Sequence, residues 1–168
     1  MSSDVSVERA KLQEAMTFLG ALADGLERAI GDSSTGISYV AGKRLGLQLS
    51  SGISKTNDVI EALNRVREVL TSNNCLWNYE PFQKHDRPAV VQQTAKGEEV
   101  EIVFRDCMIR QSLFRYGHSQ KGSLCNMMSG FFDGALQNIM GSESELTILH
   151  AGENACFKKL VIKKTNTV

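Results

Sequence analysis

The sequence has no excess of charge of either sign. Its 168 residues include 19 Lys and Arg and 19 Asp and Glu, so the formal net charge is zero. Proteins that bind the phosphates of nucleic acids usually have more basic than acidic residues, so the composition disfavours nucleic acid as a direct partner. No stretch approaches the roughly 20 apolar residues of a membrane span. Residues 1–9 lack the basic and apolar regions of a secretory signal, so we expect a cytoplasmic protein.

Sequence fingerprints of catalysis are missing as well. The chain has no P-loop, no dinucleotide-binding fingerprint, no serine elbow and no HExxH motif. Its four cysteines, at positions 75, 107, 125 and 156, form no CxxC pair. In a reducing compartment such cysteines are thiols or metal ligands before they are disulfides. These absences favour a binding protein over an enzyme.

What is present indicates one α+β domain that spans residues 1–168. Hydrophobic residues make up 42% of the chain and charged residues 23%, which is typical of a globular protein with a single core. The pattern predicts three N-terminal helices, an antiparallel strand meander, two further helices and a closing hairpin. The predicted helices cover residues 12–30, 36–46, 59–70, 107–116 and 124–139, and the predicted strands cover residues 76–82, 89–94, 100–104, 145–150 and 155–163. A hairpin turn is expected at residues 96–99, and Ser123 is expected to cap the last helix.

The first predicted helix carries an apolar seam with alternating steps of four and three residues. The seam consists of Leu12, Met16, Leu19, Ala23, Leu26 and Ile30. Such a narrow seam suits a helix that packs on another helix, within the fold or in a dimer. Residues 1–34 are therefore a candidate dimerisation element of a homodimer. In the second helix, Gly42 and Gly46 would permit a neighbouring helix to approach closely.

Residues that can bind metals gather in the last third of the chain. Cys107, Cys125, His150 and Cys156 provide the four soft or borderline ligands that a tetrahedral zinc site needs, and Glu145 is the substitute if His150 faces away. Thiolates also suit an iron–sulfur cluster. We expect the pKa of Cys125 to be lowered, because amide dipoles at a helix N-terminus favour a thiolate.

Two other interpretations of the cysteines stay open, namely a redox-active thiol pair and plain buried side chains. A similar choice applies to a set of apolar residues that either line a ligand pocket or fill the core: Met108, Phe114, Met127, Met128, Phe131 and Phe132. Lys158, Lys159, Lys163 and Lys164 are expected to form a solvated face on the last strand.

Several segments together resemble the 4-vinyl reductase domain family, which shares its fold with subunits of the trafficking particle TRAPP. These segments are GISYVAGKRLG at residues 36–46, Asp106-Cys107, Leu124-Cys125 leading into GFFDGAL, and Glu145 followed by His150-Ala-Gly and Cys156-Phe157. The resemblance implies a module that binds a small apolar molecule or a tetrapyrrole such as haem. It also implies a zinc site of the kind found in the phenol sensors of this family, with Cys125, Glu145 and Cys156 as ligands. The remaining cysteine position of that site falls on Ile148, which cannot bind a metal.

A second form of the family is also similar. The HAG-x-x-x-C pattern with the upstream Cys107 resembles redox-responsive regulators of methanogens, in which cysteines of this domain are functional. The function that the resemblance implies is a non-catalytic sensory or carrier protein that couples metal or redox state to conformation. The alternative is an accessory reductase or tetrapyrrole-binding protein of (bacterio)chlorophyll or haem metabolism.

Overall fold

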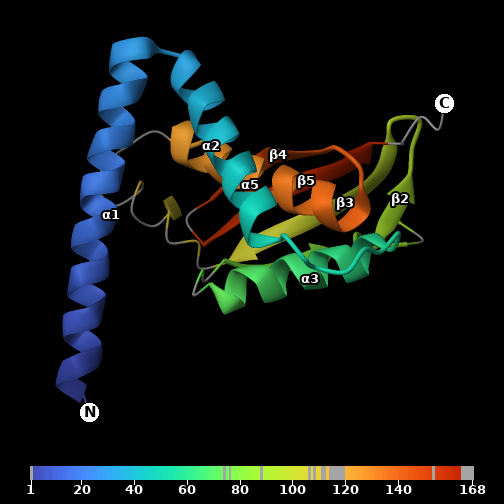
Figure 1. Cartoon of the computed structure of the whole chain (residues 1–168), viewed down its shortest axis with the longest axis horizontal. Helices are drawn as coiled ribbons and strands as arrows, with labels where there is room; N and C mark the ends of the chain where they lie inside the picture. Colours follow the sequence, from blue (N-terminus) through green and yellow to red (C-terminus); the bar gives the residue numbers. More distant parts are fainter. Residues whose placement is uncertain are drawn as a thin grey trace.

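The computed structural model packs helices on one face of an antiparallel sheet (Figure 1). It describes residues 2–73, 75, 77–87, 89–105, 107, 109–110, 113, 120–152 and 154–163, without the side chains of residues 2–10, 12 and 13. The helices are α1 (Ser2–Ile30), α2 (Ser33–Leu49), α3 (Val59–Ser72) and α5 (Ser123–Met140), and the strands are β1 (Asn78–Phe82), β2 (Val91–Gln93), β3 (Gly97–Arg105), β4 (Ser144–Ala151) and β5 (Ala155–Lys163).

The strands form one sheet in the order β1-β3-β5-β4, and β2 pairs with the N-terminal part of β3, at Glu98, Glu99 and Val100. All four pairings are antiparallel, so the predicted α+β class is confirmed. Alternate residues of β5 from Cys156 to Leu160 are buried, as expected for a strand with one face against the helices. In β3 all five residues from Val100 to Phe104 are buried, and Val100, Ile102 and Phe104 belong to the core. None of the described helices is long and apolar enough to cross a membrane.

Two helices, α2 and α5, approach each other closely enough for backbone contact. A Cβ atom built on Gly42 would lie 1.9 Å from the carbonyl oxygen of Met127, and one on Gly46 would lie 2.2 Å from that of Phe131. The contact is reciprocal, because a Cβ on Gly130 would lie 2.0 Å from the carbonyl oxygen of Tyr39. The expectation that the glycines of α2 admit a close neighbour is thus confirmed, and the neighbour is α5.

The N-terminus of α5 is capped differently from the prediction. Ser123 is the first residue of the helix and does not act as the cap. The carboxylate of Glu27, on α1, accepts hydrogen bonds from the backbone N–H and the hydroxyl of Ser123, both at 2.7 Å. This contact fastens α1 to the start of α5. At the other end, Gly141 stops the helix in the left-handed conformation.

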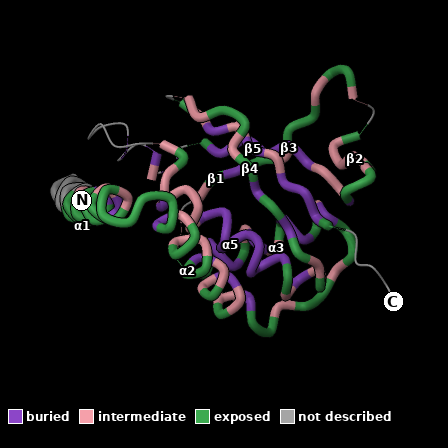
Figure 2. Tube along the Cα trace, turned by 90° about the horizontal axis from the view of Figure 1, so that it is seen from above, coloured by how far each residue is buried: buried purple, intermediate pink, exposed green. Residues whose placement is uncertain are grey.

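The long helix α1 extends beyond the body of the protein (Figure 1), and Figure 2 shows much of it in the colour of exposed residues. Of the seam residues with described side chains, only Ala23 is buried, whereas Leu19, Leu26 and Ile30 are 46%, 39% and 42% exposed. The seam is therefore not the inner face of the helix within this chain.

The segments predicted on either side of β3 compare with the structure as follows. The turn between β2 and β3 is tighter than expected, with Thr94 and Gly97 exchanging backbone hydrogen bonds, so that residues 97–99 already belong to β3. The predicted helix at residues 107–116 lies largely outside the described residues, although Ile109, Arg110 and Leu113 are helical.

Candidate functional site

Three of the cysteines line one small cavity between the sheet and α5. Cys107 follows β3, Cys125 lies in the first turn of α5, and Cys156 lies on the helix-covered face of β5. The cavity has a volume of about 10 Å³, which is room for one molecule the size of water. Its lining consists of Phe104, Cys107, Arg110, Gln120, Cys125, Met128, Ile148, Ala151, Cys156 and Lys158. We call it the cysteine cavity. It has no room for a tetrapyrrole.

Lys158 points into this cavity from β5 and is only 2% exposed. Its ammonium nitrogen lies 3.1 Å from the sulfur of Met128 and 4.6 Å from the centre of the Phe104 ring. Burial lowers the pKa of Lys158, and the three neighbouring thiols only oppose that shift. The prediction of a solvated lysine face was therefore wrong for Lys158. Lys159 and Lys163 do lie on the other face of β5, and Lys164 lies outside the described residues.

Arg110 supplies a second buried cation. It is 4% exposed, and one of its terminal nitrogens donates to the carbonyl oxygen of Gly152 at 2.9 Å. The buried Nε of the same guanidinium has no hydrogen-bond partner among the described residues. Because the described lining of the cavity contains no carboxylate, two basic side chains face three thiols without an acidic partner.

Burial makes two of the cavity thiols, those of Cys125 and Cys156, weaker acids than an ordinary cysteine. Burial raises the pKa of Cys125, and the nearby Lys158 offsets this only in part. Burial likewise raises the pKa of Cys156. The expectation of a lowered pKa for Cys125 was wrong, because removal from water outweighs the effect of the helix N-terminus.

His150 and Glu145 lie on the opposite face of the sheet from the cavity. His150 is exposed and pairs with Phe157, whose ring packs on Phe82 at a centroid distance of 5.6 Å. Directly paired residues of an antiparallel sheet share a face, so His150 faces away from Cys156. Glu145 pairs with Val161 on that same outer face. The structure therefore brings together three of the four predicted metal ligands, without His150 or its substitute.

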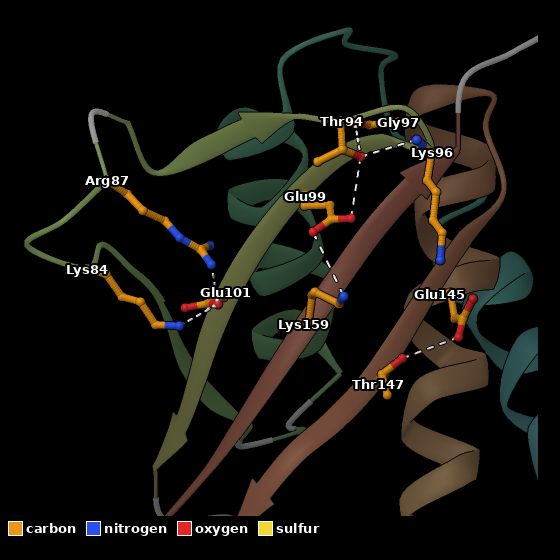
Figure 3. A network of polar contacts seen from close by, with 10 residues as sticks. All are labelled: Lys84, Arg87, Thr94, Lys96, Gly97, Glu99, Glu101, Glu145, Thr147 and Lys159. Atoms are coloured by element: carbon orange, nitrogen blue, oxygen red, sulfur yellow. Dashed lines mark hydrogen bonds and ion pairs between the residues drawn. The ribbon is translucent and has the colours of Figure 1, made fainter.

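The outer face carries its own polar network (Figure 3). Glu145 and Lys159 line a shallow depression of about 520 Å³ there, with Lys96 at its rim. Nearby, Glu101 is 5% exposed and binds Lys84 and Arg87 at 2.9 and 3.2 Å. These contacts join the loop after β1 to the middle of β3 and lie apart from the cysteine cavity.

The metal geometry can be tested on these positions. Among the residues that the structure describes, no three His, Cys, Asp or Glu side chains are arranged so that they could hold a metal ion. The four-ligand zinc site does not fit this arrangement, because one ligand is on the wrong face. Binding of zinc, an iron–sulfur cluster or haem thus has no support from the described side chains and stays a prediction from the sequence.

The residues predicted to line an apolar pocket divide into three groups. Phe131 and Phe132 are buried in the core, where Phe132 contacts the rings of Tyr79 and Phe104 at 5.2 and 5.6 Å. Met128 lies between the core and the cysteine cavity, and Met127 is half-buried against α2. Met108 and Phe114 lie outside the described residues.

Comparisons with known proteins bear on the fold. No protein-family model matches the sequence, and neither does any curated protein. Among solved structures, the chain is similar to the crystal structure of the phenol-responsive sensory domain of the transcription activator PoxR with phenol. The TM-score is 0.62 at 16% sequence identity, and the alignment covers 88% of this chain and 74% of that chain. At this identity the likeness shows a shared fold.

Proposed function

We propose that this chain is a non-catalytic sensory or carrier domain of the 4-vinyl reductase type, and that the cysteine cavity is its responsive site. The observation that carries the proposal is the meeting of three thiols, far apart in sequence, with two buried basic side chains. Among the described residues the cavity lining holds no carboxylate, and a core that serves packing alone rarely buries Lys and Arg in such surroundings, because each of these groups loses its hydration. The shared fold with a sensory domain that responds to phenol supports a small ligand.

The position of the cavity suggests how a bound ligand would be sensed. Cys107 follows β3, Cys125 begins α5, and Cys156 belongs to β5. An occupant that bonds to two of these groups joins the C-terminal hairpin to the helix that carries the core. Binding free energy then favours one packing of hairpin on helix, which a partner can recognise.

A small molecule must be able to enter a responsive site without unfolding of the whole domain. The accessibility of the cavity thiols in the folded protein therefore tests the proposal. We use methyl methanethiosulfonate, a small thiol reagent, on a Cys75→Ser background that keeps the three cavity thiols. Labelling of Cys125 is expected to be faster than global unfolding and to change hydrogen exchange in β5 and the first turn of α5. Labelling of the cavity thiols only at the rate of global unfolding would show that they are plain core residues.

Metal content tests the zinc prediction directly. Elemental analysis of the purified protein, with its Cys125→Ser and His150→Ala variants, measures zinc for each protomer. If zinc is present, the geometry predicts that Cys125→Ser loses it and His150→Ala retains it. Loss of zinc in His150→Ala would mean that His150 faces the cysteine cavity in the metal-bound state, which requires a different register of β4.

We further propose that α1 forms a homodimer through its exposed apolar row. Phe18 and Leu22 are 71% and 62% exposed, and the row continues through Leu26 to Ile30. Leu22→Glu is expected to shift the protein from dimer to monomer in light scattering coupled to size exclusion. Ala21→Glu is the matched control, because it adds the same charge at an exposed position outside the row. A dimer that survives Leu22→Glu would contradict the proposal.

A further inference from the structure

The chemistry of the cysteine cavity is unusual because an amine, thiols and a spare hydrogen-bond donor face one small volume. The amine is Lys158, which contacts a sulfur and an aromatic face in place of a carboxylate. The donor is the Nε of Arg110, which is buried and has no partner in the described part of the chain. A lysine amine among apolar atoms is a nucleophile for carbonyl carbon, and the free guanidinium N–H can hold a carbonyl oxygen.

We propose that the cysteine cavity captures a small aldehyde covalently through Lys158. This inference rests on the function proposed above and names the class of ligand for the same site. In the first step the Lys158 nitrogen attacks the carbonyl carbon, and the oxygen takes up the proton that the nitrogen releases. Loss of water then gives an imine. The thiol of a neighbouring cysteine adds its sulfur to the imine carbon and its proton to the nitrogen.

The product is one carbon bonded to both the nitrogen of Lys158 and a cysteine sulfur. Aldehyde, amine and thiol give this bridge and one water, so no oxidant or reductant is needed. Cys125 is the expected sulfur, since it lines the same cavity as Lys158 from the first turn of α5, across from the strand that carries the lysine. The bridge would join α5 to β5. It would thus fasten the hairpin to the helix in the way that the proposed function requires.

The size of the cavity sets the size of the aldehyde. A volume of about 10 Å³ admits a molecule with the dimensions of water. Formaldehyde, the smallest aldehyde, is therefore the chosen probe, and longer aldehydes should react less because the cavity has no room for a longer chain. The groups that hold the probe are already in place, so the reaction in the cavity is effectively intramolecular after entry.

The test is peptide mapping of the full chain after one molar equivalent of formaldehyde at neutral pH. The expected product is a peptide pair linked by a single carbon between Lys158 and Cys125. The Lys158→Arg variant keeps the basic side chain and should lose the product. Lys159→Arg is the matched control, because this lysine is adjacent in sequence and lies on the other face of β5. In Cys125→Ser, borohydride should trap the carbon on Lys158 without the bridge.

Four results would overturn the proposal. The first is modification spread over exposed lysines as in the unfolded chain, and the second is a linked product that persists in Lys158→Arg. The third is zinc bound by the cavity thiols of the purified protein, since these sulfurs would then be occupied. Failure of capture, with Cys125 still reachable by the thiol reagent in the native state, would reject the aldehyde and leave the sensory function standing.

Discussion

Gly130→Ala is expected to destabilise the fold by about 3 kcal/mol, whereas Gly25→Ala should leave it unchanged or slightly more stable. A Cβ on Gly130 would lie 2.0 Å from the carbonyl oxygen of Tyr39 and 2.9 Å from the backbone nitrogen of Lys43. Both atoms belong to the backbone of α2, so no side chain can rotate to make room. The two helices must separate, and the contacts along their whole interface weaken together.

Gly25 provides the comparison because it is also a helical glycine. It lies on α1, and a Cβ added there meets nothing within 4 Å. Alanine has the higher helix propensity by about 1 kcal/mol, so any change at this position should favour the fold. Urea unfolding followed by circular dichroism measures both variants. Equal stabilities for Gly130→Ala and Gly25→Ala would show that the α2–α5 distance is larger than the structure has it.

The glycines show which parts of the fold local sequence can predict. Small residues at 42 and 46 indicated a close neighbour, and periodic apolar residues located α3 and α5 to within a few residues. The helix partner itself could not be predicted, because pairing depends on the three-dimensional course of the chain. The cap of α5 could not be predicted for the same reason, because Glu27 and Ser123 are 96 residues apart in the sequence.

Strand geometry explains why only part of the candidate site could be predicted from the sequence. Alternation along β5 places Cys156, Lys158 and Leu160 on one face, so the burial of Lys158 could have been read from the pattern. His150 could not be placed in this way. Counted from Ile148 in steps of two, it should face the helices, but a bulge between Ile148 and His150 shifts the register. A single extra residue moves the side chain to the other face.

Removal of the Asp133 carboxylate is the second change with a large expected effect. Asp133 lies on α5 and is 3% exposed. One of its oxygens accepts from the hydroxyl of Tyr39 at 2.7 Å and lies 2.8 Å from the ammonium of Lys43, both on α2. The other oxygen accepts from the backbone N–H of Ser144, at the start of β4, at 2.7 Å. One side chain thus joins two helices to the sheet.

Asp133→Ala should cost about 3 to 5 kcal/mol, the range for breaking a buried ion pair from one side. The loss has two parts, since Lys43 is left without its counter-ion and the buried N–H of Ser144 is left without an acceptor. Glu143→Gln is the control. It removes an ion pair with Lys163 at 2.9 Å in which both side chains are more than half exposed, so the solvent already screens the charges and little change is expected.

The same carboxylate should make stability depend on pH in the acid range. Burial alone would raise the pKa of Asp133, but the bonds from Lys43, Ser144 and Tyr39 outweigh it and hold the pKa below its ordinary value. A carboxyl whose pKa is lower in the folded state stabilises the fold above its unfolded pKa of about 3.9, and this stability is lost as the pH falls through the folded pKa.

Asp133→Asn separates this charge effect from the loss of the side chain. The amide keeps the size of the carboxyl and cannot titrate, so the difference in unfolding free energy between wild type and variant should shrink as the pH falls below about 3.9. Urea unfolding at a series of pH values measures that difference. A difference that stays constant across the acid range would mean that the pKa of Asp133 is the same in the folded and unfolded states, and the charge of Asp133 would then contribute no net stability to the join between α2 and α5.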